Sequence, residues 1–114
     1  MVKQGHIIWV DFDPQLGHEQ QGRRPALVVN NDDFYKSTSM VIVCPITKTN
    51  RKHLFHIALD DRTKTSGIIL CEQVRSIDIS VRNYKFIEVI PKDILSVVCD
   101  TVCGFTYSGN QSSP

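Results

Sequence analysis

The chain has 114 residues, of which 22% are charged and 41% hydrophobic, and its formal net charge at pH 7 is +1. These values are typical of one globular domain and do not indicate a uniformly basic nucleic-acid binder. No apolar run is long enough to span a bilayer and the first residues lack the layout of a secretory signal, so we expect a cytoplasmic protein without membrane contact.

The first half of the chain predicts three short strands and one helical turn. Residues 6–12 alternate in polarity and are rich in aromatic and β-branched side chains, which is typical of a strand. The apolar run at 26–30 predicts a second strand, and the residues after it cap a brief helical turn over 34–37. Residues 40–46 predict a third strand, with Pro45 near its end, where a missing donor is tolerated.

The second half predicts further strands and a terminal helix. Residues 54–59 alternate, residues 67–79 read as one long strand with a bend, and residues 84–89 form the last strand. The helix is expected to begin at Pro91 and to stop near Gly104. Its apolar stripe consists of Ile94, Leu95, Val98, Val102 and Phe105. This order predicts a mainly β fold with a C-terminal α-helix, in which the sheet is strongly bent or closed into a small barrel.

One domain over residues 1–107 is expected, followed by a flexible tail over residues 108–114. The four cysteines, Cys44, Cys71, Cys99 and Cys103, are expected to be reduced and to act as small buried hydrophobes. Their spacing is not that of a zinc site, and the chain has no phosphate-binding glycine loop or nucleotide motif. We therefore expect neither a metal nor a cofactor.

The polar segment between the first two predicted strands, Gly17 to Pro25, is the most informative part of the sequence. It contains a carboxylate, two amides and two adjacent arginines: Glu19, Gln20, Gln21, Arg23 and Arg24. Such a set can hold an anion, orient a hydroxyl and read the edge of a base, and loops on rigid scaffolds often carry function. Arg24 is the first candidate, because a guanidinium matches a phosphate and Pro25 holds the preceding backbone extended. A solvated loop with arginines paired to nearby carboxylates remains the alternative.

A second basic segment follows the third predicted strand. It consists of Lys48, Arg51, Lys52 and His53. Thr47, just before it, carries a hydroxyl that can donate to a phosphate oxygen, although threonine is common at strand ends. If the two basic loops meet, they can cradle a phosphate backbone despite the low net charge. His18 and His53 lie in these loops and have the chemistry of an acid and a base.

Other polar and aromatic side chains are candidates for supporting roles. Glu72, Gln73 and Arg75 interrupt the apolar run at 67–79, which predicts a paired polar network, because burying them without partners is costly. Among the aromatic residues, Phe34 and Tyr35 are the best placed to stack on bases. Trp9 is expected in the core or at an interface.

Residues 5–14, residues 17–29 and residues 72–78 together resemble the MazF/PemK family of bacterial toxin endoribonucleases, in order as well as in separation. The most specific part is the sequence Gly-His-Glu-Gln-Gln-Gly-Arg-Arg-Pro. The resemblance implies an SH3-like barrel of the MazF/PemK/CcdB-like kind with a C-terminal helix, working as a homodimer. It also implies a toxin of a type II toxin–antitoxin system that cleaves single-stranded RNA without a metal and is held inactive by a MazE/PemI-like antitoxin.

The same resemblance suggests roles for individual residues. Arg24 matches the catalytic arginine and Thr47 the catalytic threonine, while Glu19 and Gln20 match the loop that shapes the active site. Glu72, Gln73 and Arg75 match the supporting strand motif. The basic residues expected to bind RNA are Arg23, Lys48, Arg51 and Lys52. His6 departs from the family, which usually has aspartate at this position.

The chemistry implied by the resemblance needs no protein nucleophile, because the 2′-hydroxyl of the RNA attacks the phosphorus. The products are a 2′,3′-cyclic phosphate and a 5′-hydroxyl. Arg24 would neutralise charge on the phosphate, whereas the proton transfers remain open between Arg24, Glu19, His18 and water. Two alternatives also stand: a non-catalytic toxin of the same fold that binds a protein such as DNA gyrase, and an RNA-binding module without activity.

Overall fold

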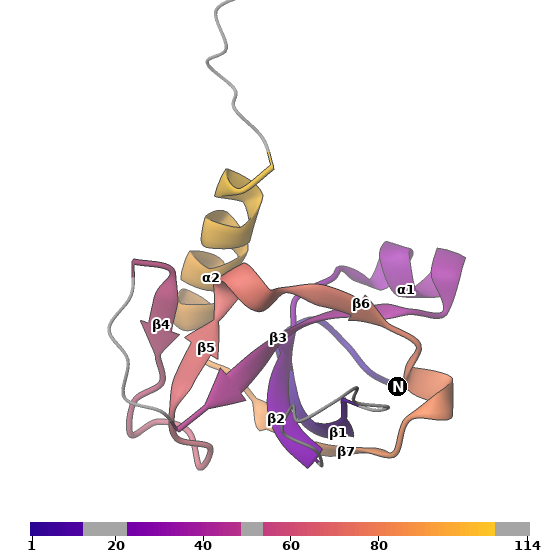
Figure 1. Cartoon of the computed structure of the whole chain (residues 1–114), viewed down its shortest axis with the longest axis horizontal. Helices are drawn as coiled ribbons and strands as arrows, with labels where there is room; N and C mark the ends of the chain where they lie inside the picture. The colour runs from indigo at the N-terminus through magenta and orange to yellow at the C-terminus, as the bar shows by residue number, and fades with distance from the viewer. Residues whose placement is uncertain (13–22, 49–53, 107–114) are drawn as a thin grey trace, which may run out of the picture.

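The computed structural model describes residues 1–12, 23–48 and 54–106. These form a bent antiparallel sheet of seven strands, with a short helix α1 (Asp32–Thr38) and a C-terminal helix α2 (Lys92–Gly104) (Figure 1). The strands are β1 (His6–Asp11), β2 (Arg23–Val28), β3 (Val41–Thr47), β4 (His56–Ala58), β5 (Ile68–Leu70), β6 (Arg75–Ile77) and β7 (Tyr84–Val89). The prediction of a mainly β fold with a C-terminal helix is confirmed.

The strand order is β4-β5-β3-β2-β1-β7, and β6 pairs with β3 beside this path. Within the described ranges no ladder joins β4 to β7, so the sheet bends strongly but does not close into the expected barrel. Strand β3 is shared between the two parts of the sheet: its first half pairs with β6 and its last residues pair with β5. As a central strand it holds both parts of the sheet together.

The prediction of one long strand over residues 67–79 is wrong. A 3-10 turn over Cys71–Gln73 separates β5 from β6, and a second turn over Ile79–Val81 follows β6. Along β3, Ile46 faces Ile69, whereas Val43 faces Arg75. Three extra residues therefore lie between the two ladders, and the turn accommodates them. An apolar run indicates extended structure but does not reveal such a change of register.

Most other boundaries moved by one to three residues. The second strand begins at Arg23 rather than at residue 26, and the predicted 54–59 strand shortens to β4. The brief turn predicted at 34–37 is a helix of 7 residues, capped by the Asn31 side chain, which accepts a hydrogen bond from the Phe34 amide at 2.9 Å. Pro91 precedes α2 as its N-cap with extended backbone, so the helix begins at Lys92.

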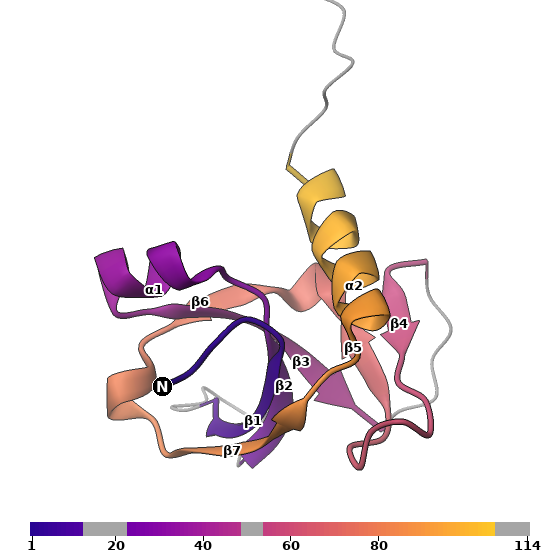
Figure 2. The same cartoon turned by 180° about the vertical axis from the view of Figure 1, so that it is seen from behind.

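The two faces of the sheet carry separate apolar clusters. Alternate residues of β3 divide between them: Val41 and Val43 face one cluster with Ile8 and Val10, while Cys44 and Ile46 face the other. Helix α2 covers the second cluster (Figure 2).

The apolar stripe predicted for the terminal helix is confirmed. Ile94 and Val98 are buried, and Leu95 and Val102 pack beside them. The Phe105 ring packs edge-to-face against Phe55 with centroids 4.8 Å apart. No helix in the described part of the chain is long and apolar enough to cross a membrane.

Candidate active site

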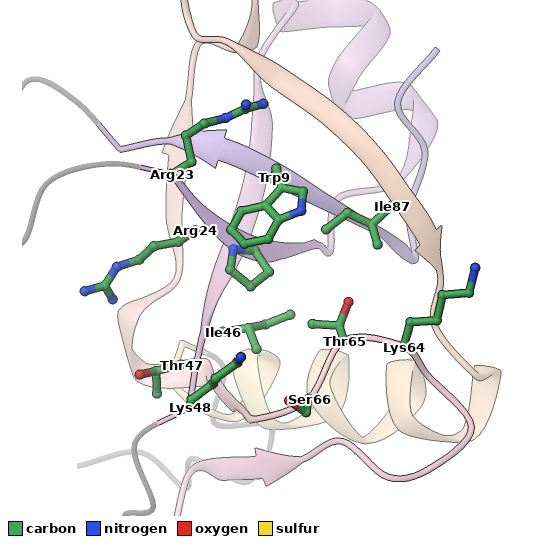
Figure 3. Close-up of a pocket in the computed structure, with 11 residues that line it drawn as sticks. Trp9, Arg23, Arg24, Ile46, Thr47, Lys48, Lys64, Thr65, Ser66 and Ile87 are labelled. Atoms are coloured by element: carbon green, nitrogen blue, oxygen red, sulfur yellow. The ribbon is translucent and has the colours of Figure 1, made fainter.

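A groove of about 540 Å³ lies where the ends of β2 and β3 meet the connection between β4 and β5 (Figure 3). Arg23 and Arg24 enter it from β2, and Thr47 and Lys48 from the end of β3. The connecting loop contributes Lys64, Thr65 and Ser66. Trp9, Pro25, Ile46 and Ile87 supply the apolar part of the lining. The structure thus brings four of the predicted site residues together: Arg23, Arg24, Thr47 and Lys48.

Strand register explains why Arg24 and Thr47 meet. In the β2–β3 ladder Ala26 faces Pro45 and Val28 faces Val43. Continuing this register by two residues places Arg24 across from Thr47, where β2 begins and β3 ends. Figure 3 shows both side chains projecting on the same side of the groove. A phosphate located there would have a planar cationic donor on one strand and a neutral hydroxyl donor on the other.

Arg23 belongs to the neighbouring ladder. It faces Asp11 of β1, and its Nε atom lies 3.9 Å from Asp11 Oδ1. Nearly half of the Arg23 side chain is exposed, so this pair adds little stability. Asp11 also anchors the far side of β1, because its carbonyl oxygen accepts a hydrogen bond from Arg82 Nη1 at 2.9 Å. Arg23 therefore remains accessible at the groove while it is loosely oriented by Asp11.

Trp9 lines the groove, although the sequence interpretation favoured Phe34 and Tyr35 as the stacking residues. Its neighbours Ile8 and Val10 are fully buried, whereas Trp9 is 41% exposed and faces Pro25 across the β1–β2 ladder. Figure 3 shows its indole in the middle of the groove. The alternation of residues 6–12 already contained this signal, because it sets Trp9 on the face opposite Ile8 and Val10. The favoured stacking candidates, Phe34 and Tyr35, are half-buried in α1 instead.

The loop wall of the groove is held by Glu88 of β7. Glu88 Oε1 accepts a hydrogen bond from the Lys64 amide at 3.0 Å, and Oε2 accepts from the Thr65 amide and hydroxyl, each at 2.8 Å. Burial alone raises the pKa of Glu88, but the hydrogen bonds from Lys64 and Thr65 outweigh it and hold the pKa below its usual value. The carboxylate is therefore ionised at neutral pH and keeps the loop attached to β7.

A second anchor attaches the start of this loop to helix α2. Arg62 donates from Nη1 and Nη2 to both carboxylate oxygens of Asp93, each at 3.0 Å, and from Nη2 to Asp60 at 2.8 Å. The hydrogen bonds from Arg62 lower the pKa of both aspartates. The pairing of Arg62 with Asp93 joins residues 31 positions apart, so no local sequence pattern indicates it.

Gly67 ends the loop and lies directly against Thr47. Its φ is +128°, and a Cβ atom built on it would lie 2.3 Å from the Thr47 carbonyl oxygen. Only a residue without a side chain allows the two backbones to approach so closely. The position of Thr47 thus depends on the glycine that immediately precedes β5.

The predicted supporting motif, Glu72, Gln73 and Arg75, does not lie in a buried strand. Glu72 and Gln73 are exposed in the 3-10 turn, and Arg75 is exposed on β6. Glu72 Oε2 lies 3.0 Å from His56 Nε2, and the Arg75 guanidinium lies 5.4 Å from the Phe12 ring centroid. Glu72 thus pairs with His56 of β4, a partner that the sequence did not suggest, and none of the three residues lines the groove.

Several sequence candidates lie outside the described residues: Glu19 and Gln20, Arg51 and Lys52, and both loop histidines, His18 and His53.

Cys44 and Cys71 are buried as expected, and each contacts the other in the α2-side cluster. The expectation of burial is wrong for Cys103, which is exposed near the end of α2. In the described ranges no three histidine, cysteine or acidic side chains gather as metal ligands.

Comparison with known proteins places this groove in context. Residues 3–105 match the family described as PemK-like, MazF-like toxin of type II toxin–antitoxin system. The endoribonuclease PemK of Escherichia coli is 37% identical over 101 residues, which cover 85% of this chain and 76% of that protein. A crystal structure of MazF from Deinococcus radiodurans superposes with a TM-score of 0.81 at 33% identity, over 91% of this chain and 94% of that one. A MazE-MazF structure from the same organism gives the same TM-score, identity and coverage.

Proposed function

The chain belongs to the PemK-like, MazF-like toxins of type II toxin–antitoxin systems and is an endoribonuclease, and we propose that it cleaves single-stranded RNA in the groove between Arg24 and Thr47. The observation that carries this assignment is the charge of the groove. Its described lining includes four cations, Arg23, Arg24, Lys48 and Lys64, and no carboxylate, although the whole chain has a net charge of only +1. A concave surface of one charge sign attracts a polyanion despite a nearly neutral total.

The reaction proposed for this site uses the RNA as its own nucleophile. The 2′-hydroxyl gives up its proton as its oxygen attacks the adjacent phosphorus, the bond from phosphorus to the 5′-oxygen breaks, and the leaving 5′-oxygen takes up a proton. Arg24 stabilises the charge that grows on the phosphate oxygens, and Thr47 donates a hydrogen bond to one of them. The products are a 2′,3′-cyclic phosphate and a 5′-hydroxyl. Arg24, Glu19, His18 and water are the candidates for the proton transfers.

The apolar part of the groove supports a preference for unpaired RNA. A base can stack on a protein side chain only when it is not held in a base-paired helix, and sequence-specific RNA recognition relies largely on such unpaired bases. The exposed indole of Trp9 next to Pro25 offers a face of this kind, a short way from Arg24. A strand with its scissile phosphate at Arg24 and one flanking base on Trp9 fits both halves of the lining.

The partner of such a toxin is its cognate antitoxin, of the MazE/PemI-like type. We propose that an acidic segment of the antitoxin occupies the cationic groove and so excludes RNA. We also propose that residues 1–107 act as one domain, that the toxin works as a homodimer, and that it acts in the cytoplasm, where its RNA is found. An antitoxin complex that leaves Arg23 and Arg24 in solvent would contradict the proposed mode of inhibition.

Incubation of the purified protein with a long single-stranded RNA in EDTA tests the proposed activity. We expect cuts at preferred sequences with cyclic phosphate ends, and Arg24→Ala and Thr47→Ala should each lower the rate by roughly 100- to 1,000-fold while the fold persists. Lys36→Ala, which removes an exposed charge on α1, serves as the matched control. Wild-type rates in Arg24→Ala would remove Arg24 from the mechanism. Intact RNA with folded wild-type protein would favour the protein-binding alternative.

A further inference from the structure

The connection between β4 and β5 has more anchors than are needed to close it. At its base the Leu59 amide donates to the Gly67 carbonyl at 2.9 Å, and Arg62 joins the first half to Asp93 of α2. These contacts already fix both ends of the loop. Glu88 makes three further hydrogen bonds, all of them with the tip formed by Lys64 and Thr65. The additional anchor fixes the tip relative to β7.

The consequence of this anchor is the position of one cation. Two consecutive amides, of Lys64 and Thr65, point at the Glu88 carboxylate, so the Lys64 backbone has a defined orientation at the edge of the groove. The Thr65 hydroxyl also donates its hydrogen bond to Glu88, so this proton is not available to a ligand in the groove. The Lys64 side chain is exposed, and within the described ranges no carboxylate lies within ion-pair distance of it.

Lys64 lies at the opposite side of the groove from Arg24 (Figure 3). Arg24 and Thr47 can hold one phosphate between them, and a strand that continues past Trp9 brings a neighbouring phosphate toward the loop wall. An ammonium on a flexible stem suits this task, because it acts as a point charge and accepts many phosphate orientations. Precise geometry is needed only at the phosphate that reacts.

We propose that Lys64 binds a phosphate that flanks the scissile one, and that Glu88 is the positioning residue that sets Lys64 at the groove. This inference rests on the proposed function and adds a second point of attachment for the RNA strand, on the wall that faces Arg24. Glu88 does not touch RNA in this arrangement and acts only through the loop tip.

The salt dependence of RNA binding tests the proposed contact. The probe is a single-stranded RNA whose 2′-hydroxyls are methylated, so that it binds without being cut, and binding is followed between about 50 and 300 mM salt. The logarithm of the affinity falls linearly with the logarithm of the salt concentration, and one phosphate contact on a single strand contributes about 0.7 to the magnitude of this slope. We expect Lys64→Ala to reduce the magnitude of the slope by about this amount and Lys64→Arg to retain it. Lys36→Ala is the matched control and should leave the slope unchanged.

The positioning role of Glu88 has its own readout. Glu88→Gln keeps the size of the side chain but loses one acceptor oxygen. We expect it to reduce the magnitude of the salt slope as Lys64→Ala does. The double variant should show no further loss, because both changes remove the same contact. An additive loss in the double variant would overturn the positioning role.

The two levels of the proposal can fail separately. A wild-type protein that cleaves RNA while Lys64→Ala keeps the full slope would overturn the Lys64 contact and leave the proposed function standing. A folded wild-type protein that neither binds nor cleaves the RNA would overturn both. Lys64 is exposed, so Lys64→Ala keeps the test valid even if Glu88→Gln unfolds.

Discussion

At the scale of single residues, Gly67 controls the site without being able to contact RNA through a side chain. A methyl group there would meet the Thr47 carbonyl oxygen at 2.3 Å, and the φ of +128° is unfavourable for any other residue. We expect Gly67→Ala to reduce the free energy of unfolding by about 1–3 kcal/mol and to lower the cleavage rate at least tenfold, because Thr47 must move. Gly104→Ala is the control, since a Cβ atom there has no neighbour within 4 Å. Equal activity in both variants would contradict this coupling.

Trp9 allows a second test at the same scale. It is the one tryptophan of the chain, so RNA that stacks on it should change the intrinsic fluorescence directly. We expect Trp9→Ala to weaken RNA binding by about 1–3 kcal/mol, the usual contribution of one stacked base. Tyr84→Ala is the matched control, because Tyr84 has a similar exposure but lies away from the groove. Unchanged fluorescence on addition of bound RNA would remove Trp9 from the site.

At the scale of elements, helix α2 stabilises the sheet face behind the groove. Ile94 is buried against β-strand residues of the second cluster, whereas Val97, on the outer side of the same helix, is 48% exposed. We expect Ile94→Ala to cost about 2–5 kcal/mol of unfolding free energy and Val97→Ala less than about 0.5 kcal/mol. Urea unfolding of the two variants measures the difference. Similar losses would mean that α2 does not pack as described.

The elements also show how far the sequence alone could lead. Alternation and apolar runs predicted β1, β3, β7 and α2 closely, because each follows from its own local pattern. The break between β5 and β6 was not predictable in this way, since it depends on the register against β3. Arg24 and Thr47 were predicted individually, but their meeting required the β2–β3 register. The contact of Glu88 with Lys64 joins residues 24 positions apart and left no local signal.

At the scale of the whole molecule, the response to pH combines two kinds of group. Asp60, Asp78, Glu88 and Asp93 all have a lowered pKa, from hydrogen bonds that outweigh burial. Their stabilising contribution is full above the ordinary carboxyl pKa and is lost as the pH falls through the lowered values. His6 differs: burial lowers its pKa from 6.5, aided by the positive N-terminus and Lys3, and its Nδ1 accepts a hydrogen bond from the Lys3 amide at 3.2 Å.

These shifts predict a decline of stability in two stages. Protonated His6 is favoured in the unfolded chain, so the free energy of unfolding should fall as the pH drops below 6.5. A second, larger fall should follow below about pH 4, where the carboxylates protonate. Urea unfolding at about pH 7.5, 5.5 and 3.5 measures both stages. His6→Asn should abolish the first and leave the second, and a wild-type protein equally stable at the two higher values would contradict the role of His6.

The hydrogen bond from the Leu59 amide to the Gly67 carbonyl closes the loop between them at its base. The pairing of β4 with β5 is complete without residues 60–66, so this stretch can change its sequence while the sheet keeps its geometry. Since Lys64, Thr65 and Ser66 of this stretch line the groove, substitutions there change the lining while the ends of β2 and β3 keep theirs. Exchange of this short segment between relatives is therefore a way to vary one wall of the groove without altering the sheet.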